Sequence, residues 1–344
     1  MKSLPLSRRQ CLRWGAAAAL AAAATGGRGQ PPVTGPGAGS VADGALEVQA
    51  AAEPLEWDWH DPSRKRAVPV RIYLPKPAAA AGTVPLVVFS HGIGGSRRGY
   101  SWLGRHFAHQ GVACMHLQHV GSDRQLWSGN VFSLVGRLQS AAQEAEALAR
   151  VHDLRFALDT LLSGPLAQRI DANRIMAVGH SYGANTALLA AGARVRRPGQ
   201  PPLLMADDRL RAAIIISAPP FHGHGDPADI LAGVQIPTLH VTATEDVIRI
   251  PGYFSGLEDR VAVFEATASR RKWLAVFEGG SHSMFTDRLG AGGLALNPRV
   301  KSATRELASA FARAVFEDDS RDMAAWPQRH HEILARYSGF SASV

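Results

Sequence analysis

A serine flanked by glycines is the feature of the sequence with the clearest chemical meaning. Segment 175–188 begins with an apolar run, continues through Gly179-His-Ser181-Tyr-Gly183 and ends in small and apolar residues. A serine hydroxyl is presented for attack when it sits on a sharp turn between a strand and a helix, and the two glycines remove side chains that would collide there. The segment therefore predicts a nucleophilic Ser181, with a helix N-terminus that favours developing negative charge.

Serine is a weak nucleophile at neutral pH, so this chemistry requires a histidine base and a carboxylate that orients it. In the chain order that accompanies this turn, the acid follows the serine and the histidine comes last. His282 lies in a loop of small residues after the apolar run 273–277, and Asp246 lies where another strand is expected to end. Glu245 is the alternative acid, because only one of two adjacent carboxylates can point inward. The expected triad is Ser181, His282 and Asp246.

An oxyanion intermediate needs two backbone N–H donors, one from the residue after the nucleophile and one from the loop after an earlier strand. The loop 90–95 follows the apolar run 84–89, and its glycines let backbone amides approach a substrate. We expect the N–H groups of Ile93 and Tyr182 to form this oxyanion hole. His91 is expected to brace the loop by hydrogen bonding, without a direct part in the chemistry.

Alternating strand-like and helical segments are expected to hold these residues in place. Segment 68–74 alternates with period two, which is typical of a half-buried strand near a sheet edge. Continuous apolar runs, which suit strands buried on both faces of a parallel sheet, occur at 84–89, 112–117, 175–178, 212–216, 239–241 and 273–277. Helical spacing occurs around Leu103, in 154–161, from Leu188 onward and in 300–315. The pattern predicts the α/β class, with a mostly parallel sheet and helices on both faces.

The N-terminus has the pattern of an export signal. Segment 7–13 contains paired arginines and precedes the alanine run 16–24, which is too short to span a bilayer, since that takes about 20 apolar residues. It resembles a twin-arginine signal, with Cys11 where a bulky apolar residue is usual. The resemblance implies transport by the twin-arginine machinery to the periplasm or the medium, with no membrane span in the mature protein.

We therefore expect a signal peptide over 1–24, a flexible linker rich in Gly, Ala and Pro over 25–52, and one folded domain over 53–344. With 344 residues, 46% of them hydrophobic and 19% charged, the chain can bury a large core and is too apolar to be disordered. Only Cys114 remains after the signal peptide, and its apolar surroundings predict a buried thiol.

The formal net charge of +8 does not predict nucleic-acid binding. Four basic residues among the first 13 contribute half of it, and the remaining Arg and Lys residues are scattered among acidic ones. Nucleic-acid binding requires a clustered basic face, so nucleic acid is not an expected partner. We also expect no cofactor and no metal. His222, His224 and Asp226 have a spacing that suits zinc, but without further clustered ligands a polar loop is the favoured interpretation.

The substrate pocket is the least defined part of the sequence. Segment 121–136 follows a predicted strand and is a candidate for a partial lid or an acyl pocket. The aromatic residues considered as pocket lining are Trp102, Trp127, Phe132 and Phe285. Packing in the core is the alternative role for each of them.

Ordered motifs between about Arg66 and Arg288 resemble a known group of proteins. They are Val68-Pro-Val-Arg-Ile-Tyr73, Phe89-Ser-His-Gly-Ile-Gly-Gly-Ser-Arg97, Gln118-His-Val-Gly-Ser-Asp123, Asp153-Leu-Arg-Phe-Ala-Leu-Asp159, Gly179-His-Ser-Tyr-Gly-Ala184, His240-Val-Thr-Ala-Thr-Glu-Asp246 and Gly280-Ser-His-Ser-Met-Phe285. Together they resemble the α/β-hydrolase superfamily, and within it bacterial proteins described as predicted dienelactone hydrolases, which are similar to platelet-activating-factor acetylhydrolase. Ala243 and Ser281 depart from the family's usual glycine and acidic residue.

This resemblance implies an α/β-hydrolase fold and a metal-independent serine hydrolase of carboxylic esters, with Ser181, Asp246 and His282 at the family's catalytic positions. Because true dienelactone hydrolases use a cysteine nucleophile, their activity is not implied. Short acyl esters, including acetylated lipids, are the expected substrates. One alternative is a lipase or cutinase-like hydrolase of lipids or polyesters, and another is a scaffold that binds a ligand without turning it over.

Overall fold

The computed structural model describes residues 53–76, 82–128, 130, 133–197, 199–221, 224–250, 253–288 and 293–340. The expected signal peptide and the whole of the expected linker lie outside the described residues. The same holds for Phe132 and His222.

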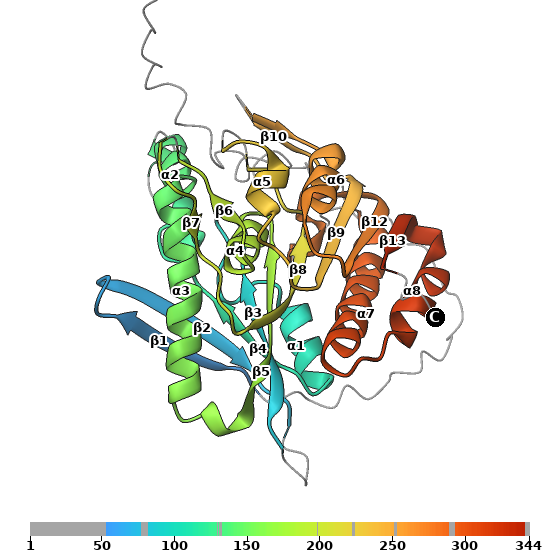
Figure 1. The fold of residues 1–344 in the computed structure, drawn as a ribbon, viewed down its shortest axis with the longest axis horizontal. Coiled ribbons are helices and arrows are strands. Elements are labelled where there is room, and N and C mark those ends of the chain that lie inside the picture. Colours follow the sequence, from blue (N-terminus) through green and yellow to red (C-terminus); the bar gives the residue numbers. More distant parts are fainter. Residues whose placement is uncertain are drawn as a thin grey trace, which may run out of the picture.

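A nine-stranded sheet forms the centre of the domain, in the order β1-β2-β4-β3-β5-β8-β9-β12-β13 (Figure 1). Its strands are β1 (Leu55–Asp61), β2 (Arg66–Tyr73), β3 (Val84–Ser90), β4 (Ala113–Leu117), β5 (Ile170–His180), β8 (Leu210–Ile216), β9 (Thr238–Glu245), β12 (Lys272–Ser281) and β13 (Leu334–Gly339). Pairing is parallel from β4 through β12 and antiparallel at both edges. The predicted α/β class with a mostly parallel sheet is confirmed.

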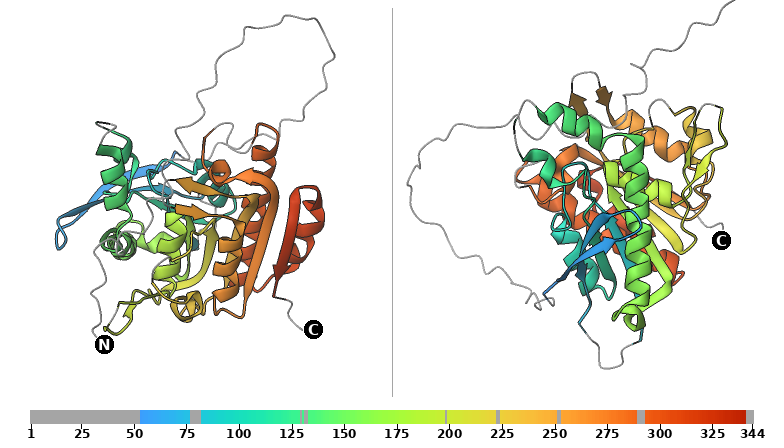
Figure 2. Two further views of the ribbon diagram at one scale, coloured as in Figure 1. Left: turned by 90° about the horizontal axis from the view of Figure 1, so that it is seen from above. Right: turned by 90° about the vertical axis from the view of Figure 1, so that its left-hand side faces the viewer.

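Helices cover both faces of this sheet, as predicted (Figures 1 and 2). The helices are α1 (Ser101–His109), α2 (Leu134–Ala141), α3 (Glu144–Ser163), α4 (Tyr182–Ala190), α5 (Pro227–Leu231), α6 (Leu257–Ala266), α7 (Leu296–Phe316) and α8 (Arg321–Arg329). The right-hand view of Figure 2 has α3 (green) in front of the sheet and α7 (orange-red) behind it. Two small ribbons, β6 (Arg194–Val195) with β7 (Leu203–Leu204) and β10 (Ile248–Ile250) with β11 (Tyr253–Ser255), lie outside the main sheet.

Side chains of the central strands alternate between two apolar layers. In β3, Leu86 and Val88 pack with α3 and α4, whereas Val87 and Phe89 pack with α1 and α7. Because both faces are covered, each central strand is an uninterrupted apolar run, which is why the sequence revealed these strands. Cys114 of β4 is buried in the layer that contains α1 and α7, and the predicted buried thiol is confirmed.

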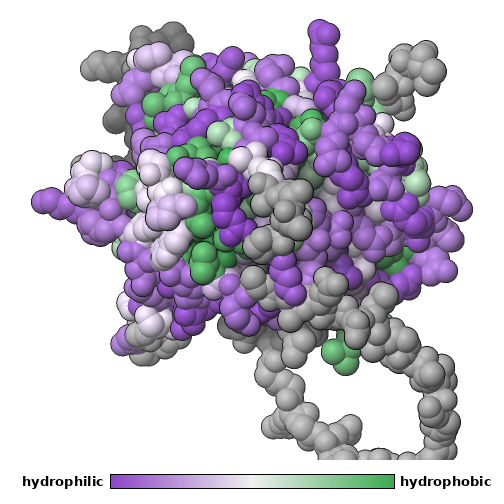
Figure 3. All heavy atoms as spheres, turned by 90° about the horizontal axis from the view of Figure 1, so that it is seen from below, coloured by the Kyte–Doolittle hydropathy of each residue, from purple (hydrophilic) through white to green (hydrophobic). Residues whose placement is uncertain are grey.

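The sheet extends beyond the predicted strands at both edges. β1 pairs antiparallel with β2, so the period-two strand is second from the edge, and β13 closes the other edge beside β12. Edge strands face solvent on more sides and carry polar residues, so their hydropathy gave no signal. On the face drawn in Figure 3 hydrophilic residues predominate and apolar ones form small patches. Within the described part of the chain, no helix combines the length and apolarity that crossing a membrane requires.

Several buried histidines are held neutral by the fold. Loss of hydration lowers the pKa of His116, His119, His180 and His240 from an ordinary value of 6.5 to about 3. Between about pH 6.5 and pH 3 these histidines bind protons in the unfolded chain but not in the folded chain, so the free energy of unfolding falls as the pH falls. We expect the free energy of unfolding to decrease by more than about 1.4 kcal/mol per pH unit between pH 6 and 4, the slope of a single proton.

Urea denaturation at a series of pH values measures this slope. The matched control is His240→Gln, which removes one buried imidazole that packs against Phe264. In this variant the free energy of unfolding should change less steeply with pH, by about 1.4 kcal/mol per pH unit, because one fewer histidine takes up a proton on unfolding. A stability profile that is flat over this pH range would contradict the prediction.

Candidate active site

Ser181 occupies the turn between β5 and α4, as the sequence predicts. β5 ends at His180 and α4 begins at Tyr182, so the serine alone makes the reversal, with φ 56° and ψ −125°. Its own N–H donates to the carbonyl of Ile216 at 2.9 Å, and its carbonyl accepts from the N–H of Ala184 at 2.8 Å. This strained backbone, stored at a strand–helix junction, holds the side chain at the C-terminal edge of the sheet.

The two glycines of the motif are required by close backbone contacts. A Cβ atom at Gly179 would lie 2.0 Å from the carbonyl oxygen of Gly183, and one at Gly183 would lie 1.9 Å from the carbonyl oxygen of Ser90. Real Cβ atoms do not approach backbone oxygens so closely, so no larger residue fits at either position without moving the turn. The motif thus reflects packing of α4 against β5 and the end of β3.

The structure brings Ser181, His282 and Asp246 into one hydrogen-bonded line. Ser181 Oγ lies 2.9 Å from His282 Nε2, and His282 Nδ1 lies 2.7 Å from Asp246 Oδ1. Asp246 follows β9, and His282 begins the 3₁₀ helix η5 (His282–Phe285) directly after β12. β9 and β12 are parallel neighbours with Glu245 opposite Ser281, so their carboxyl ends meet.

Asp246, and not Glu245, faces the histidine. Asp246 is fully buried and accepts a hydrogen bond from Thr242 Oγ1 at 2.7 Å, whereas Glu245 is exposed. Burial by itself raises the pKa of this carboxyl, but the electrostatic interaction and hydrogen bond with His282 and the positive charge of Arg260 outweigh burial and hold its pKa well below the usual range. Asp246 is therefore ionised and able to orient the imidazole.

Two groups that sequence reasoning missed support this line. Arg260 of α6 lies 3.5 Å from Asp246 Oδ1 and also donates to Ser255 Oγ. Thr242 lies on β9, four residues before Asp246. Arg260 follows Asp246 in the chain without any motif around it, so nothing in the sequence indicated its role.

A buried His180–Tyr100 pair holds the backbone of the candidate base. The carbonyl of His282 only accepts, so His180 Nε2 donates to it, at 3.0 Å, and His180 Nδ1 accepts from Tyr100 Oη at 2.8 Å. Burial, with a smaller contribution from His282, lowers the pKa of His180 to about 3, so the ring stays neutral and keeps this tautomer. His180 is a variable position of the Gly-x-Ser-x-Gly pattern, so the motif gave no information about it.

The predicted oxyanion donors are both close to Ser181, because Tyr182 follows it in the chain and Ile93 lines the same cavity. Neither Ile93 N–H nor Tyr182 N–H donates a hydrogen bond to another described residue. The loop that carries Ile93 approaches the nucleophile closely, because a Cβ at Gly92 would lie 3.2 Å from Ser181 Cβ. Such free amides beside a serine hydroxyl are available to a developing oxyanion.

His91 braces this loop, as expected. Its Nδ1–H donates to the carbonyl of Gly92 at 2.7 Å, and its Nε2 accepts from the N–H of His119 at 3.1 Å. His91 is buried, and burial lowers its pKa well below the usual value, so it is neutral. The loop after β3 is thereby tied to the loop after β4.

A cavity of about 340 Å³ opens beside Ser181 and His282. Its walls are the loop after β3, the 3₁₀ helix η2 (Arg124–Trp127) and residues 283–288. Trp127 lines the cavity and donates from Nε1 to the carbonyl of Gly94 at 2.9 Å. Part of segment 121–136 therefore borders the site, in line with the expected pocket.

Two of the aromatic residues proposed as pocket lining are not part of the cavity wall. Phe285 is fully buried and packs on Phe277 and His180. Trp102 donates from Nε1 to the carbonyl of Phe285 at 3.1 Å and packs against the same apolar layer. Both side chains therefore belong to this apolar layer, and of the three described candidates only Trp127 lines the cavity.

The polar loop considered for zinc is described only in part. The carboxylate of Asp226 accepts from Ala228 N–H at 2.9 Å and caps the N-terminus of α5. Among the described residues no group of three His, Cys, Asp or Glu side chains could hold a metal ion. His222 lies outside the described residues.

Comparison with known proteins identifies the family. A family model described as "Alpha/beta hydrolase family" matches residues 87–341. A solved structure of a ferulic acid esterase from Streptomyces cinnamoneus is 19% identical, with a TM-score of 0.55 over 82% of this chain and 95% of that chain, which shows a shared fold. The search of curated proteins found no match. Because the family model spans most of the chain, the protein belongs to the alpha/beta hydrolase family.

Proposed function

We propose that this protein is a serine hydrolase of carboxylic esters. The proposal rests above all on the line of two hydrogen bonds, 2.9 and 2.7 Å long, that joins Ser181 Oγ through His282 to the buried Asp246 carboxylate. This line ends at a cavity with two free backbone N–H groups beside the hydroxyl. The family match and the esterase named among the similar structures are consistent with this activity.

Acylation begins when Ser181 Oγ attacks the ester carbonyl and His282 Nε2 takes the hydroxyl proton. Asp246 accepts a hydrogen bond from His282 Nδ1–H and offsets the charge of the imidazolium that forms. The N–H groups of Ile93 and Tyr182 bind the oxyanion. The imidazolium then gives its proton to the leaving alcohol as the C–O bond breaks.

Deacylation repeats these steps with water. His282 takes a proton from a water molecule that attacks the acyl carbonyl, and the same amides bind the second oxyanion. Return of the proton to Ser181 Oγ releases the carboxylic acid. The His180–Tyr100 pair keeps the base at one position through both steps, because it holds the His282 carbonyl.

The cavity supports short acyl esters as substrates. Its volume of about 340 Å³ is close to the lower end for pockets that enclose drug-sized ligands, roughly 300 to 1,000 Å³. Trp127 supplies an apolar wall beside the nucleophile. A long acyl chain would have to leave this space, so it would gain less from burial than a chain that fits inside.

Hydrolysis of p-nitrophenyl esters from acetate to palmitate tests this function. We expect kcat/KM to fall with acyl chain length, because only short chains are enclosed. A rise with chain length would replace the short-acyl proposal by the lipase or cutinase-like alternative. Folded protein that neither hydrolyses these esters nor reacts with a fluorophosphonate would show the proposal to be wrong and would favour the ligand-binding scaffold.

A further inference from the structure

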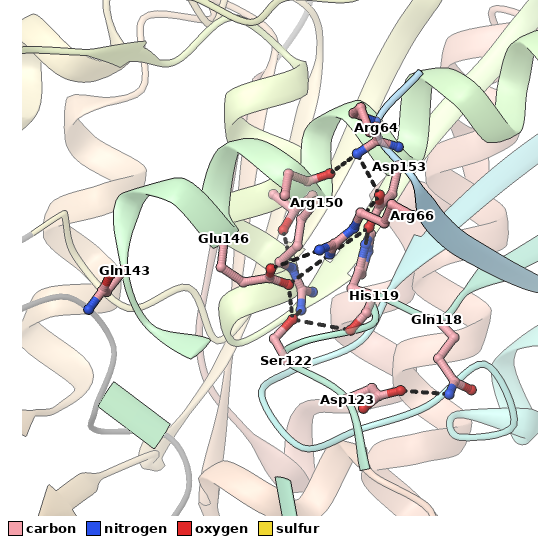
Figure 4. Close-up of polar contacts among 12 residues, drawn as sticks. Arg64, Arg66, Gln118, His119, Ser122, Asp123, Gln143, Glu146, Arg150 and Asp153 are labelled. Carbon is pink, nitrogen blue, oxygen red and sulfur yellow. Dashed lines mark hydrogen bonds and ion pairs between the residues drawn. The ribbon is translucent and has the colours of Figure 1, made fainter. Parts of the chain in front are cut away.

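Arg150 is a buried cation that the mechanism above does not use. It lies on α3, is completely inaccessible to solvent, and donates to three separate parts of the chain, of which Ser122 is labelled beside it in Figure 4. Nη2 donates to the carbonyl of His91, Nη1 donates to Ser122 Oγ at 2.9 Å, and Nε donates to Thr186 Oγ1 at 2.9 Å. One guanidinium thus joins the loop after β3, the loop after β4 and helix α4.

The first of these contacts fixes the loop that carries one oxyanion donor. His91, whose carbonyl binds the guanidinium, lies two residues before Ile93. The residue after Ile93 is held as well, because Gly94 N–H donates to the carbonyl of Ser122 at 2.8 Å. Arg150 contacts both of the loops that this hydrogen bond joins, through the His91 carbonyl and Ser122 Oγ, so the position of Ile93 N–H depends on it.

The same guanidinium supports the second donor. Its central carbon lies 4.7 Å from the centroid of the Tyr182 ring, in cation–π contact. Thr186 Oγ1, which accepts from Arg150, itself donates to the carbonyl of Tyr182 at 3.1 Å. Tyr182 is therefore held to Arg150 at both its side chain and its backbone.

The fold supplies charges that keep Arg150 ionised. Ser122 Oγ, which accepts from Arg150, donates to Glu146 Oε1 at 2.7 Å, and Arg66 links Glu146 to Asp153 through hydrogen bonds of 2.9 to 3.2 Å (Figure 4). Burial lowers the pKa of Arg150 to about 10, so the side chain remains charged at neutral pH. A fork of donors in fixed geometry is needed to hold three acceptors at once, and the single ammonium of lysine does not provide it.

We propose that Arg150 is a positioning residue that fixes the N–H groups of Ile93 and Tyr182 relative to each other, and so sets the geometry of the oxyanion hole. This inference rests on the proposed ester hydrolysis. An interaction that only stabilised the fold would affect unfolding and leave the chemical step unchanged. Positioning predicts a loss confined to the state in which the oxyanion exists.

Arg150→Met, compared with Arg64→Met, separates these roles. Arg64 is partly exposed and belongs to the same hydrogen-bonded network, but its hydrogen bonds go to Asp61, Asp153 and the Ala149 carbonyl and not to residues that hold either donor. We expect Arg150→Met to lower kcat for p-nitrophenyl acetate by about 10²-fold, the effect of losing one oxyanion donor, with KM little changed. Arg64→Met should lower stability and leave kcat unchanged.

A second readout uses an alkyl trifluoromethyl ketone, which forms a tetrahedral adduct with a serine and places an anionic oxygen in the oxyanion hole. In Arg150→Met the inhibition constant should rise by the same factor by which kcat falls. In Arg64→Met it should not change. Arg150→Lys, which keeps the charge without the fork, should fall between wild type and Arg150→Met. If Arg150→Met does not fold, the same two measurements on Arg150→Lys test the proposal.

Equal kcat in wild type and in folded Arg150 variants would overturn the positioning role and leave the esterase proposal intact. So would parallel losses of kcat in Arg150→Met and Arg64→Met. Absence of ester hydrolysis by the wild-type protein would instead refute the proposed function, and this inference with it.

Discussion

Ser181→Ala is expected to lower kcat for p-nitrophenyl acetate by a factor on the order of 10⁶, because the hydroxyl that forms the acyl-enzyme is lost. Alanine keeps the Cβ atom and meets the same positive φ as serine, so the turn between β5 and α4 should persist. The variant should unfold at nearly the wild-type temperature. Steady-state kinetics on protein purified from a host lacking other esterases, with thermal unfolding in parallel, measures both effects.

The matched control is Ser309→Ala. This serine of α7 is also buried and hydrogen-bonded to an imidazole, since its Oγ lies 2.9 Å from His106 Nε2, but it is remote from the cavity. It should keep the wild-type kcat and its reaction with a fluorophosphonate, whereas Ser181→Ala should not be labelled. Labelling or near-wild-type turnover of Ser181→Ala would rule out this serine as the nucleophile.

Asp246→Asn is expected to lower kcat by about 10⁴-fold, the loss typical of a triad whose acid is replaced by its amide. A neutral amide cannot offset the imidazolium on His282, and its NH₂ group can turn the ring to the wrong tautomer. The substitution also leaves Arg260, which lies 3.5 Å from the carboxylate, without its negative partner. We therefore also expect lower stability, measured by urea unfolding beside the kinetics.

Glu245→Gln is the matched control, because it makes the same chemical change one residue earlier in the chain. Glu245 is exposed, so its variant should retain wild-type kcat and stability. If Glu245→Gln were inactive and Asp246→Asn active, the acid would be Glu245, the alternative that the sequence leaves open. Wild-type kcat in both variants would show that neither of these two carboxylates acts in the reaction.

Local patterns were sufficient to predict the fold class and the nucleophile turn. The strand, the turn and the helix around Ser181 are contiguous in the sequence. Gly179 and Gly183 are required because a Cβ atom at either position would lie within 2.0 Å of a carbonyl oxygen, so the pattern of residues is sufficient to predict the turn. The central strands were equally visible, because burial on both faces makes each of them a continuous apolar run. The edge strands β1 and β13 have no such continuous apolar run, since most of their residues are partly or fully exposed.

Contacts between residues far apart in the sequence were decided only by the tertiary structure. The choice between Glu245 and Asp246 depends on which side chain β9 turns toward β12, and the pattern of residues is the same for both. An aromatic residue such as Trp102 or Phe285 can line a pocket or pack in a core, and the sequence does not distinguish these roles. In the folded protein Phe285 is buried and Trp102 donates a hydrogen bond to its carbonyl, so both belong to the core.

The buried polar groups around the site show the same limit most clearly. Arg150, Arg260 and His180 have no motif of their own, and they acquire partners only when α3, α6 and η5 pack against the sheet. A charged side chain in a sequence predicts solvent exposure, because burial of an unpaired charge is costly. Folding reverses that expectation where it supplies enough fixed partners, and sequence spacing does not encode partners that lie tens of residues away.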